Sequence, residues 1–136
     1  MRLIVLDTNV IVSAGINPGG APAKIVAGQV LRGMIHLVTC PGVAAEYREV
    51  VRRSKFHRYR FPPLWLEYLI EASMQLPNPA PGSFVCPDPK DTHFIALARA
   101  AGAWLVTGNL KHFPEAVRNG VSVVSPASYL AHLAGN

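Results

Sequence analysis

The sequence is poor in cysteine, in aspartate and in long apolar runs, and each shortage limits what the protein can be. Its two cysteines, Cys40 and Cys86, form neither a CxxC pair nor part of a zinc-binding His/Cys array. We expect them to be reduced thiols, as in cytosolic proteins. No apolar run reaches the roughly 18 residues that a membrane span needs, and the early charges of Arg2 and Asp7 do not fit a signal peptide. We therefore expect a cytoplasmic protein with no membrane association.

Length and composition indicate one folded domain. The chain has 136 residues, of which 50% are hydrophobic, so it can bury a substantial core. We expect a single domain over residues 1–136. The formal net charge of +5 and the pI of about 9.6 favour an anionic partner such as nucleic acid, although charge alone is a weak indication.

Short apolar segments alternate with helix-like segments along the chain. This alternation predicts an α/β domain with a mainly parallel sheet and right-handed crossovers. The segment 77–89 contains five prolines and a glycine and predicts an irregular loop. The predicted strands cover 2–7, 35–39, 104–107 and 121–124, and the predicted helices cover 22–33, 43–54, 63–75, 91–101, 114–119 and the residues from 127.

The aspartates occur at only two places in the sequence. Asp7 follows the apolar run 3–6, and Asp88 and Asp91 flank the start of a predicted helix. Ligands of parallel α/β sheets bind beyond the carboxyl ends of the strands, where Asp7 is expected. Clustered carboxylate oxygens bind hard divalent cations such as Mg²⁺, and these cations promote phosphodiester hydrolysis. The pattern therefore suggests a nuclease.

Each aspartate also has a simpler structural explanation. Asp7 could cap the helix that begins next, but a carboxylate at the end of a buried strand needs a cation or hydrogen-bond donors, and the two interpretations are equally supported. Asp91 could also be a helix cap, yet it precedes Phe94 and Ile95 by three and four residues and so faces the buried side. Turn chemistry adequately explains Asp88, which lies between two prolines.

Glu46 lies on the apolar stripe of its predicted helix, with Val43 and Val50. A carboxylate on that face should be paired or bound to a cation. Taken alone, it is better explained by a salt bridge to a nearby arginine, of which there are three: Arg48, Arg52 and Arg53. At the edge of the same sheet, Asn109 would supply a neutral oxygen or orient water, and Thr107 would supply a hydroxyl.

Four motifs, in this order and spacing, resemble the PIN domain over about residues 1–124. The first is Leu-Asp-Thr-Asn-Val-Ile-Val, and the second is the glutamate in the third predicted helix. The others are Pro-Asp-Pro-Lys-Asp-Thr-His-Phe-Ile-Ala-Leu-Ala and Leu-Val-Thr-Gly-Asn-Leu-Lys-His-Phe. The chain is most similar to bacterial and archaeal PIN proteins that are classed as toxins of toxin–antitoxin pairs, the VapC-like ribonucleases.

The resemblance implies a three-layer α/β/α domain that hydrolyses RNA with Mg²⁺ or Mn²⁺. By motif, Asp7, Glu46 and Asp91 match catalytic, metal-binding acids of the family. The fourth acidic position corresponds to Asn109, or in another alignment to His112, and neither is a carboxylate. We predict a catalytic role for Asn109. Candidate accessory residues are Asn9, Asp88, Thr107 and His112.

The leading hypothesis is a metal-dependent endoribonuclease, the toxin of a toxin–antitoxin pair. Its expected partners are an RNA substrate, an antitoxin protein and a second copy of the chain. The missing fourth acid motivates an alternative, a catalytically weak RNA- or partner-binding module. A haloacid-dehalogenase-like phosphatase is disfavoured, because Asn9 stands where that class has its second aspartate. A receiver domain is disfavoured because no acidic pair precedes the end of the first strand.

Six of the thirteen Lys and Arg residues lie between positions 48 and 60, interleaved with aromatic side chains. Such a segment suits single-stranded RNA, although a solvated helix end is the simpler explanation. The apolar stripe that follows is expected to pack into the core, and part of it could bind an antitoxin or a second copy. The predicted RNA-binding residues are Arg48, Arg52, Arg53, Lys55, Arg58 and Arg60, and the stripe is Phe61, Leu64, Trp65, Tyr68 and Leu69.

Overall fold

The computed structural model describes residues 2–53, 63–80 and 85–135, and its centre is a five-stranded parallel sheet. The sheet order is β3-β2-β1-β4-β5, so the first strand of the chain lies in the middle. β1 pairs with β2 on one side and with β4 on the other, and it aligns Leu6 with Val106. The strands are β1 (Leu3–Leu6), β2 (His36–Thr39), β3 (Met74–Gln75), β4 (Trp104–Val106) and β5 (Val123–Val124).

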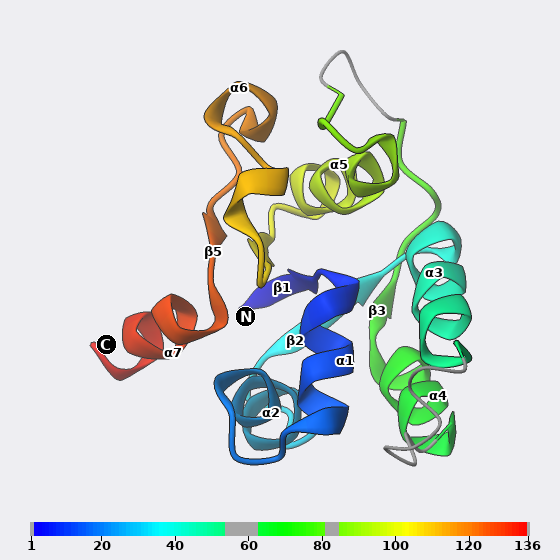
Figure 1. The fold of residues 1–136 in the computed structure, drawn as a ribbon, viewed down its shortest axis with the longest axis vertical. Coiled ribbons are helices and arrows are strands. Elements are labelled where there is room, and N and C mark those ends of the chain that lie inside the picture. The colour runs from blue at the N-terminus through cyan, green and yellow to red at the C-terminus, as the bar shows by residue number, and fades with distance from the viewer. Residues whose placement is uncertain (1, 54–62, 81–84, 136) are drawn as a thin grey trace.

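Helices flank the sheet, as predicted for a three-layer α/β/α domain. Figure 1 shows α5 on one side of β1 and β2, and α1 and α2 on the other. The segment predicted as a helix over 22–33 forms α2, a π-helical turn (η1) and then a turn that includes Gly33. The helical elements are α1 (Thr8–Ile16), α2 (Ala21–Ile25), η1 (Val26–Val30), α3 (Pro41–Val51), α4 (Pro63–Ala72), η3 (Pro89–Asp91), α5 (Thr92–Ala101), η4 (Leu110–His112), α6 (Glu115–Arg118) and α7 (Pro126–Ala134).

The core forms where the apolar strands meet the apolar faces of the helices. Ile4, Val5 and Leu6 of β1 are fully buried because neighbouring strands cover both of its edges and helices cover its faces. α5 contributes Phe94 and Ile95 to this core, as their spacing predicts. α5 ends at Gly102, whose φ of 66° is left-handed, so a glycine suits this position. Among the described residues, no helix is long and apolar enough to cross a membrane.

The prediction of one helix over 63–75 was wrong at its end. α4 stops at Ala72, and the two residues of β3 follow after Ser73. The Ser73 hydroxyl lies 2.7 Å from Oγ1 of Thr39, and the amide of Leu76 donates to the Thr39 carbonyl at 2.9 Å. Tertiary contacts with β2 therefore override the local helical pattern.

The prediction that the stripe after residue 60 packs into the core was also wrong in part. Leu69 is buried, but 83% of Leu64 and 61% of Tyr68 is exposed. The buried face of α4 instead carries Leu66 and Ile70 beside Leu69. Phe61 lies outside the described residues.

Candidate active site

The site begins at the carboxyl ends of β1 and β4. Because these strands pair in parallel, Asp7 and Thr107 follow them side by side at one edge of the sheet. The amide of Asp7 donates to the Val106 carbonyl at 2.9 Å, and the Thr107 hydroxyl donates to Oδ2 of Asp7 at 2.7 Å. Thr107 is fully buried, so this hydrogen bond fixes the Asp7 carboxylate inside the protein.

Asp7 occupies the N-cap position of α1, but its side chain makes no capping hydrogen bond. Only 5% of the residue is exposed. Burial raises the pKa of Asp7, and the hydrogen bond from Thr107 opposes that rise. The backbone amides of Thr8 and Asn9, at the start of α1, also lower the pKa of Asp7, so the carboxylate lies at the helix N-terminus as well as beside Thr107.

Glu46 reaches the same edge from α3. The hydroxyl of Thr8, the residue after Asp7, donates to Oε2 of Glu46 at 2.5 Å. Glu46 is half-buried; burial raises its pKa, the Thr8 hydrogen bond lowers it, and the charge of Asp7 raises it further. Two of the arginines considered as salt-bridge partners contact other carboxylates: Arg48 meets Glu67 at 2.8 Å, and Arg53 meets Glu49 at 3.8 Å.

Asp91 completes the set from the end of η3, immediately before α5. It is 8% exposed, and burial together with the charge of Asp7 raises its pKa to about 6. Its Oδ2 lies 3.1 Å from Nδ1 of His112 without the alignment of a hydrogen bond. This oxygen is therefore buried without a hydrogen-bond partner, a costly state that a positive ligand would relieve.

His112 and Asn109 stand beside Asp91, where the sequence offers no fourth acid. Nδ2 of Asn109 lies 2.8 Å from Nε2 of His112, and the Asn109 amide donates to the Thr107 hydroxyl at 3.0 Å. If Nε2 accepts from Asn109, the neutral ring carries its proton on Nδ1, which lies 3.1 Å from Oδ2 of Asp91 but is not aligned for a hydrogen bond. An imidazole thus meets the Asp91 carboxylate.

The accessory residues differ in their placement. Asn9, in the first turn of α1, connects this helix to the loop after β4: its Oδ1 accepts from the Gly108 amide at 3.0 Å, and its Nδ2 lies 3.4 Å from Oδ2 of Asp7. A Cβ on Gly108 would lie 3.2 Å from that Asn9 oxygen, so this close approach favours glycine. Asp88 is exposed and accepts from the Lys90 amide at 3.0 Å, which agrees with turn chemistry.

Two contributors to the site were missed by the sequence analysis. Tyr47 is fully buried, and its hydroxyl donates to the carbonyl of Leu6, which ties α3 to the end of β1. The sequence analysis assigned no role to Thr8, whose hydroxyl holds Glu46. The position of Tyr47 four residues after Val43 is a signal of burial, but no pattern in the sequence indicates the bond to Leu6.

The predicted RNA-binding residues are only partly described. Arg48 and Arg53 lie at the end of α3 and just after it, and each contacts a glutamate. Arg52 is the C-cap residue of α3. The remaining three, Lys55, Arg58 and Arg60, lie outside the described residues. RNA binding by this set stays a prediction.

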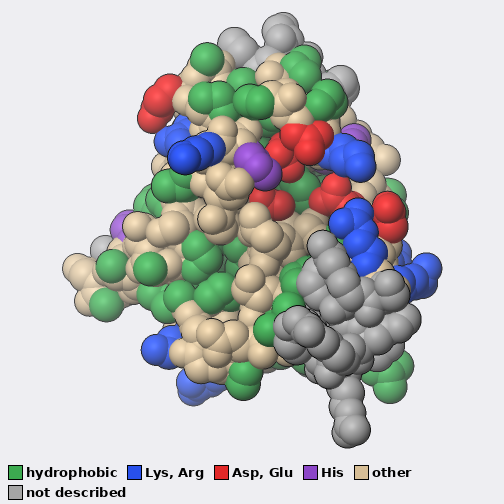
Figure 2. Space-filling view, in the orientation of Figure 1, with side chains coloured by type: hydrophobic (Ala, Val, Ile, Leu, Met, Phe, Trp, Pro, Cys, Tyr) green, Lys and Arg blue, Asp and Glu red, His purple; other side chains and the backbone are tan. Residues whose placement is uncertain are grey.

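The three carboxylates supply the oxygen donors that a hard divalent cation prefers. Among the described residues, no three His, Cys, Asp or Glu side chains already form a group that could hold a metal ion. The Asp91 oxygen has no hydrogen-bond partner, and burial and the charge of Asp7 raise the pKa of Asp91 and of Glu46; both observations fit a cation at this edge. In Figure 2, acidic side chains gather near the upper centre of the visible face, with Lys and Arg on both sides.

These features define a parallel α/β domain with carboxylates gathered at the carboxyl edge of its sheet. The model of the PIN domain family matches residues 3–111. The chain therefore belongs to the PIN domain family, as its motifs predict.

Relatives and solved structures agree with this assignment. An uncharacterized protein of Methanocaldococcus jannaschii is 30% identical over 109 residues, which cover 78% of this chain and 70% of that protein. The fold is similar to that of DNA-bound VapBC2 from Rickettsia felis, with a TM-score of 0.63, 17% identity, and coverage of 91% of this chain and 98% of that one. FitAcB from Neisseria gonorrhoeae has a TM-score of 0.57 and 20% identity, with coverage of 91% and 98%.

Proposed function

We propose that this chain is a divalent-metal-dependent endoribonuclease that hydrolyses RNA phosphodiester bonds. One observation carries the proposal: Asp7, Glu46 and Asp91 come from three separate elements and lie near enough for their charges to interact, and Asp91 has a buried oxygen without a hydrogen-bond partner. Membership of the PIN domain family supports it.

In this proposal each side chain has a separate task. Asp7, Glu46 and Asp91 would hold the cation, Mg²⁺ or Mn²⁺, which supplies Lewis-acid chemistry to water and phosphate when it is bound. Thr107 keeps the Asp7 carboxylate oriented, and Thr8 does the same for Glu46. The Asn109–His112 pair lies beside Asp91, where it can contact a substrate phosphate or orient a water molecule.

Cleavage of a labelled single-stranded RNA tests the proposal. With Mn²⁺ or Mg²⁺ the wild-type chain should cut the RNA, and a chelator should stop the reaction. Asp7→Asn keeps the shape of the side chain but removes its charge, so cleavage should fall by about 100-fold or more, which corresponds to about 3 kcal/mol of transition-state stabilisation. Equal cleavage by both proteins would indicate a contaminating nuclease and contradict the proposal.

We further propose that the chain acts in the cytoplasm as the toxin of a toxin–antitoxin pair. The fold similarity to VapBC and FitAcB supports this role. Exposed apolar side chains on α4, Leu64 and Tyr68, offer a surface for an antitoxin or a second copy. Co-expression with the product of an adjacent gene should yield a complex in which RNA cleavage is inhibited. Failure of every neighbouring gene product to inhibit cleavage would argue against the toxin role.

A catalytically weak RNA- or partner-binding module is the second candidate. It is favoured by the contact of His112 with Asp91, because an imidazole stands where a fourth carboxylate would strengthen cation binding. Such a module would bind RNA without cutting it in any divalent cation. Binding and cleavage assays on the same preparation separate the two functions.

A further inference from the structure

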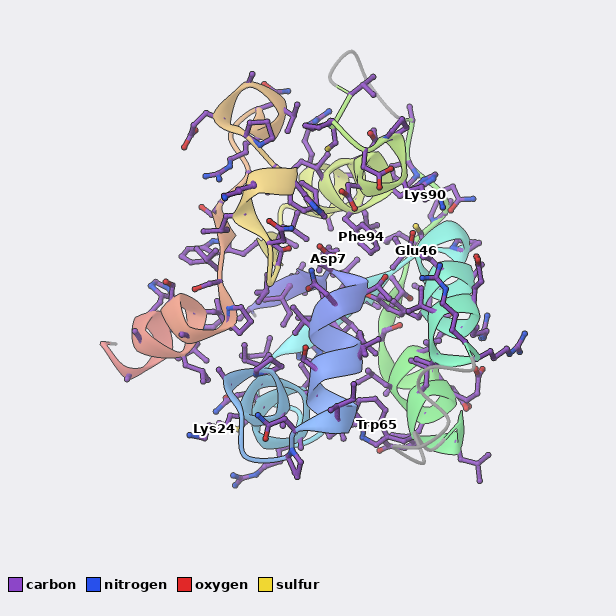
Figure 3. All side chains as sticks on the ribbon, in the orientation of Figure 1. Asp7, Lys24, Glu46, Trp65, Lys90 and Phe94 are labelled. Atoms are coloured by element: carbon purple, nitrogen blue, oxygen red, sulfur yellow. The ribbon has the colours of Figure 1, made fainter. Side chains whose placement is uncertain are left out.

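A cleft opens beside Glu46, between one side of α3, continuing to Arg53 just after it, and the start of α5. It has a volume of about 240 Å³. In Figure 3, Lys90 and Glu46 lie close together at this place, with Phe94 and Asp7 next to them toward the sheet. The cleft therefore adjoins the candidate active site on its α3 side. Its lining comprises Gly42, Val43, Ala45, Glu46, Glu49, Arg53, Lys90, His93 and Phe94.

The wall of the cleft combines an apolar floor with a cationic rim. Val43 and Phe94 are buried and form part of the floor, whereas Lys90 is exposed and Arg53 has 47% of its side chain exposed. The imidazole of His93 is close enough to Glu46 to lower the pKa of that carboxyl. Cations beside an apolar surface match a nucleotide, whose phosphate is anionic and whose sugar and base have apolar faces.

The absence of a side chain at Gly42 helps to keep the cleft open. A Cβ there would lie 3.3 Å from Oδ1 of Asn78 and 3.9 Å from Nδ1 of His93. The Gly42 amide donates to the same Asn78 oxygen at 2.9 Å, which fixes the start of α3.

We propose that this cleft binds the nucleotide next to the scissile phosphate of a single-stranded RNA, with Lys90 and Arg53 as its phosphate contacts. The inference rests on the proposed nuclease function and adds the path of the strand, which runs between α3 and α5. A volume of about 240 Å³ accepts part of one strand and not a duplex.

Glu49 provides a second test of the electrostatic part of the proposal, because removing its negative charge should strengthen RNA binding. Its carboxylate lines the same cleft and lies 3.8 Å from Nη2 of Arg53, with 73% of its side chain exposed. It should repel a phosphate and compete for Arg53. Glu49→Gln should therefore bind RNA more tightly than the parent.

The experiment measures fluorescence anisotropy of a short labelled single-stranded RNA over a series of salt concentrations. All variants carry Asp7→Asn and are measured in Mg²⁺, so that the RNA stays intact. Lys90→Ala and Arg53→Ala should each weaken binding about fivefold and reduce the salt slope by about 0.7, the value for one lost phosphate contact. Lys24→Ala and Arg32→Ala remove exposed charges outside the cleft and serve as matched controls. Circular dichroism confirms that each variant is folded.

The outcomes separate this inference from the proposed nuclease function. Weaker binding by the two cleft variants than by the controls, together with tighter binding by Glu49→Gln, supports the cleft. If the Asp7-containing protein cuts RNA but the cleft variants bind like the controls, the cleft assignment is wrong and the nuclease stands. If it does not cut RNA but the cleft variants bind weakly, the nuclease is wrong, and the cleft stands as an RNA-binding site without its place beside a scissile phosphate. Absence of RNA binding overturns both.

Discussion

Asp91 destabilises the folded chain at neutral pH in the absence of a cation. Its pKa of about 6 lies above the ordinary aspartate pKa of 3.8, so between these pH values the folded state holds a proton that the unfolded state has lost. The free energy of unfolding therefore falls as pH rises from about 4 to 6, and the penalty is complete above pH 6. Such a penalty is expected of a group kept for function rather than for stability.

Replacing Asp91 with a neutral residue should therefore increase the stability of the fold and decrease RNA cleavage. In a chelator at pH 7.5, Asp91→Asn should raise the free energy of unfolding by about 1–3 kcal/mol, because each unit of pKa difference corresponds to about 1.4 kcal/mol. This gain in stability should vanish as pH falls toward 4. In a separate assay with the metal present, Asp91→Asn should lose RNA cleavage. Urea denaturation across this pH range measures the effect. Asp88→Asn, at an exposed position, is the control and should change stability much less. An Asp91→Asn protein no more stable than wild type at pH 7.5 would contradict the assignment.

For individual residues, the sequence indicated which acids belong to the candidate site but not which side chains hold them in place. Motif and spacing single out Asp7, Glu46 and Asp91, and the structure brings all three to one edge. The Thr8–Glu46 bond joins residues 38 positions apart, and the Thr107–Asp7 bond joins residues 100 positions apart. Such contacts depend on strand order and helix orientation, which no local pattern encodes.

Among the elements, α3 has the most direct influence on the site. It carries Glu46, and its neighbour Tyr47 ties the helix to the end of β1 through the Leu6 carbonyl. The ring of Tyr47 also stacks on Phe94 of α5, with centroids 6.4 Å apart. Tyr47 thus connects β1, α3 and α5, the elements that bring the three carboxylates together.

Removing this hydroxyl should loosen α3 against β1. Tyr47→Phe retains the ring but leaves the buried Leu6 carbonyl without that donor, so we expect a loss of about 1–3 kcal/mol of stability. RNA cleavage should fall as well, because Glu46 follows the helix. Thermal unfolding and cleavage rates measure the two effects. Tyr129→Phe, on α7, is the matched control and should leave cleavage unchanged. Full cleavage by Tyr47→Phe would show that the site does not depend on this contact.

The bounds of helices and strands were largely predictable where the periodicity of apolar residues is strong. They were less predictable where tertiary contacts determine the structure. β1, α3 and α5 lie close to their predicted ranges because their apolar patterns match the buried faces. β3 was missed because its two residues are too short for a pattern and are selected by pairing with β2. The buried face of α4 was misassigned because Leu64 and Tyr68 are as apolar as the residues that are buried.

For the molecule as a whole, cation binding should increase stability, because a ligand that binds only the folded state stabilises it. At a concentration 100 times the dissociation constant the gain is about 2.7 kcal/mol. Mn²⁺ should therefore raise the melting temperature of the wild-type chain by several degrees, and a chelator should reverse the rise. Asp7→Asn should abolish the shift, which differential scanning calorimetry can follow. An equal shift in both proteins would place the cation elsewhere.

The position of β1 in the middle of the sheet has a consequence during translation. β1 is made before its neighbour β4, which is completed only at Val106, and Asp7 needs the hydroxyl of Thr107. A ribosome-bound fragment that ends before residue 104 thus contains all three acids yet lacks the partner that fixes the first. Under the proposed function, the growing polypeptide could not attack the message that encodes it until β4 and Thr107 had been made.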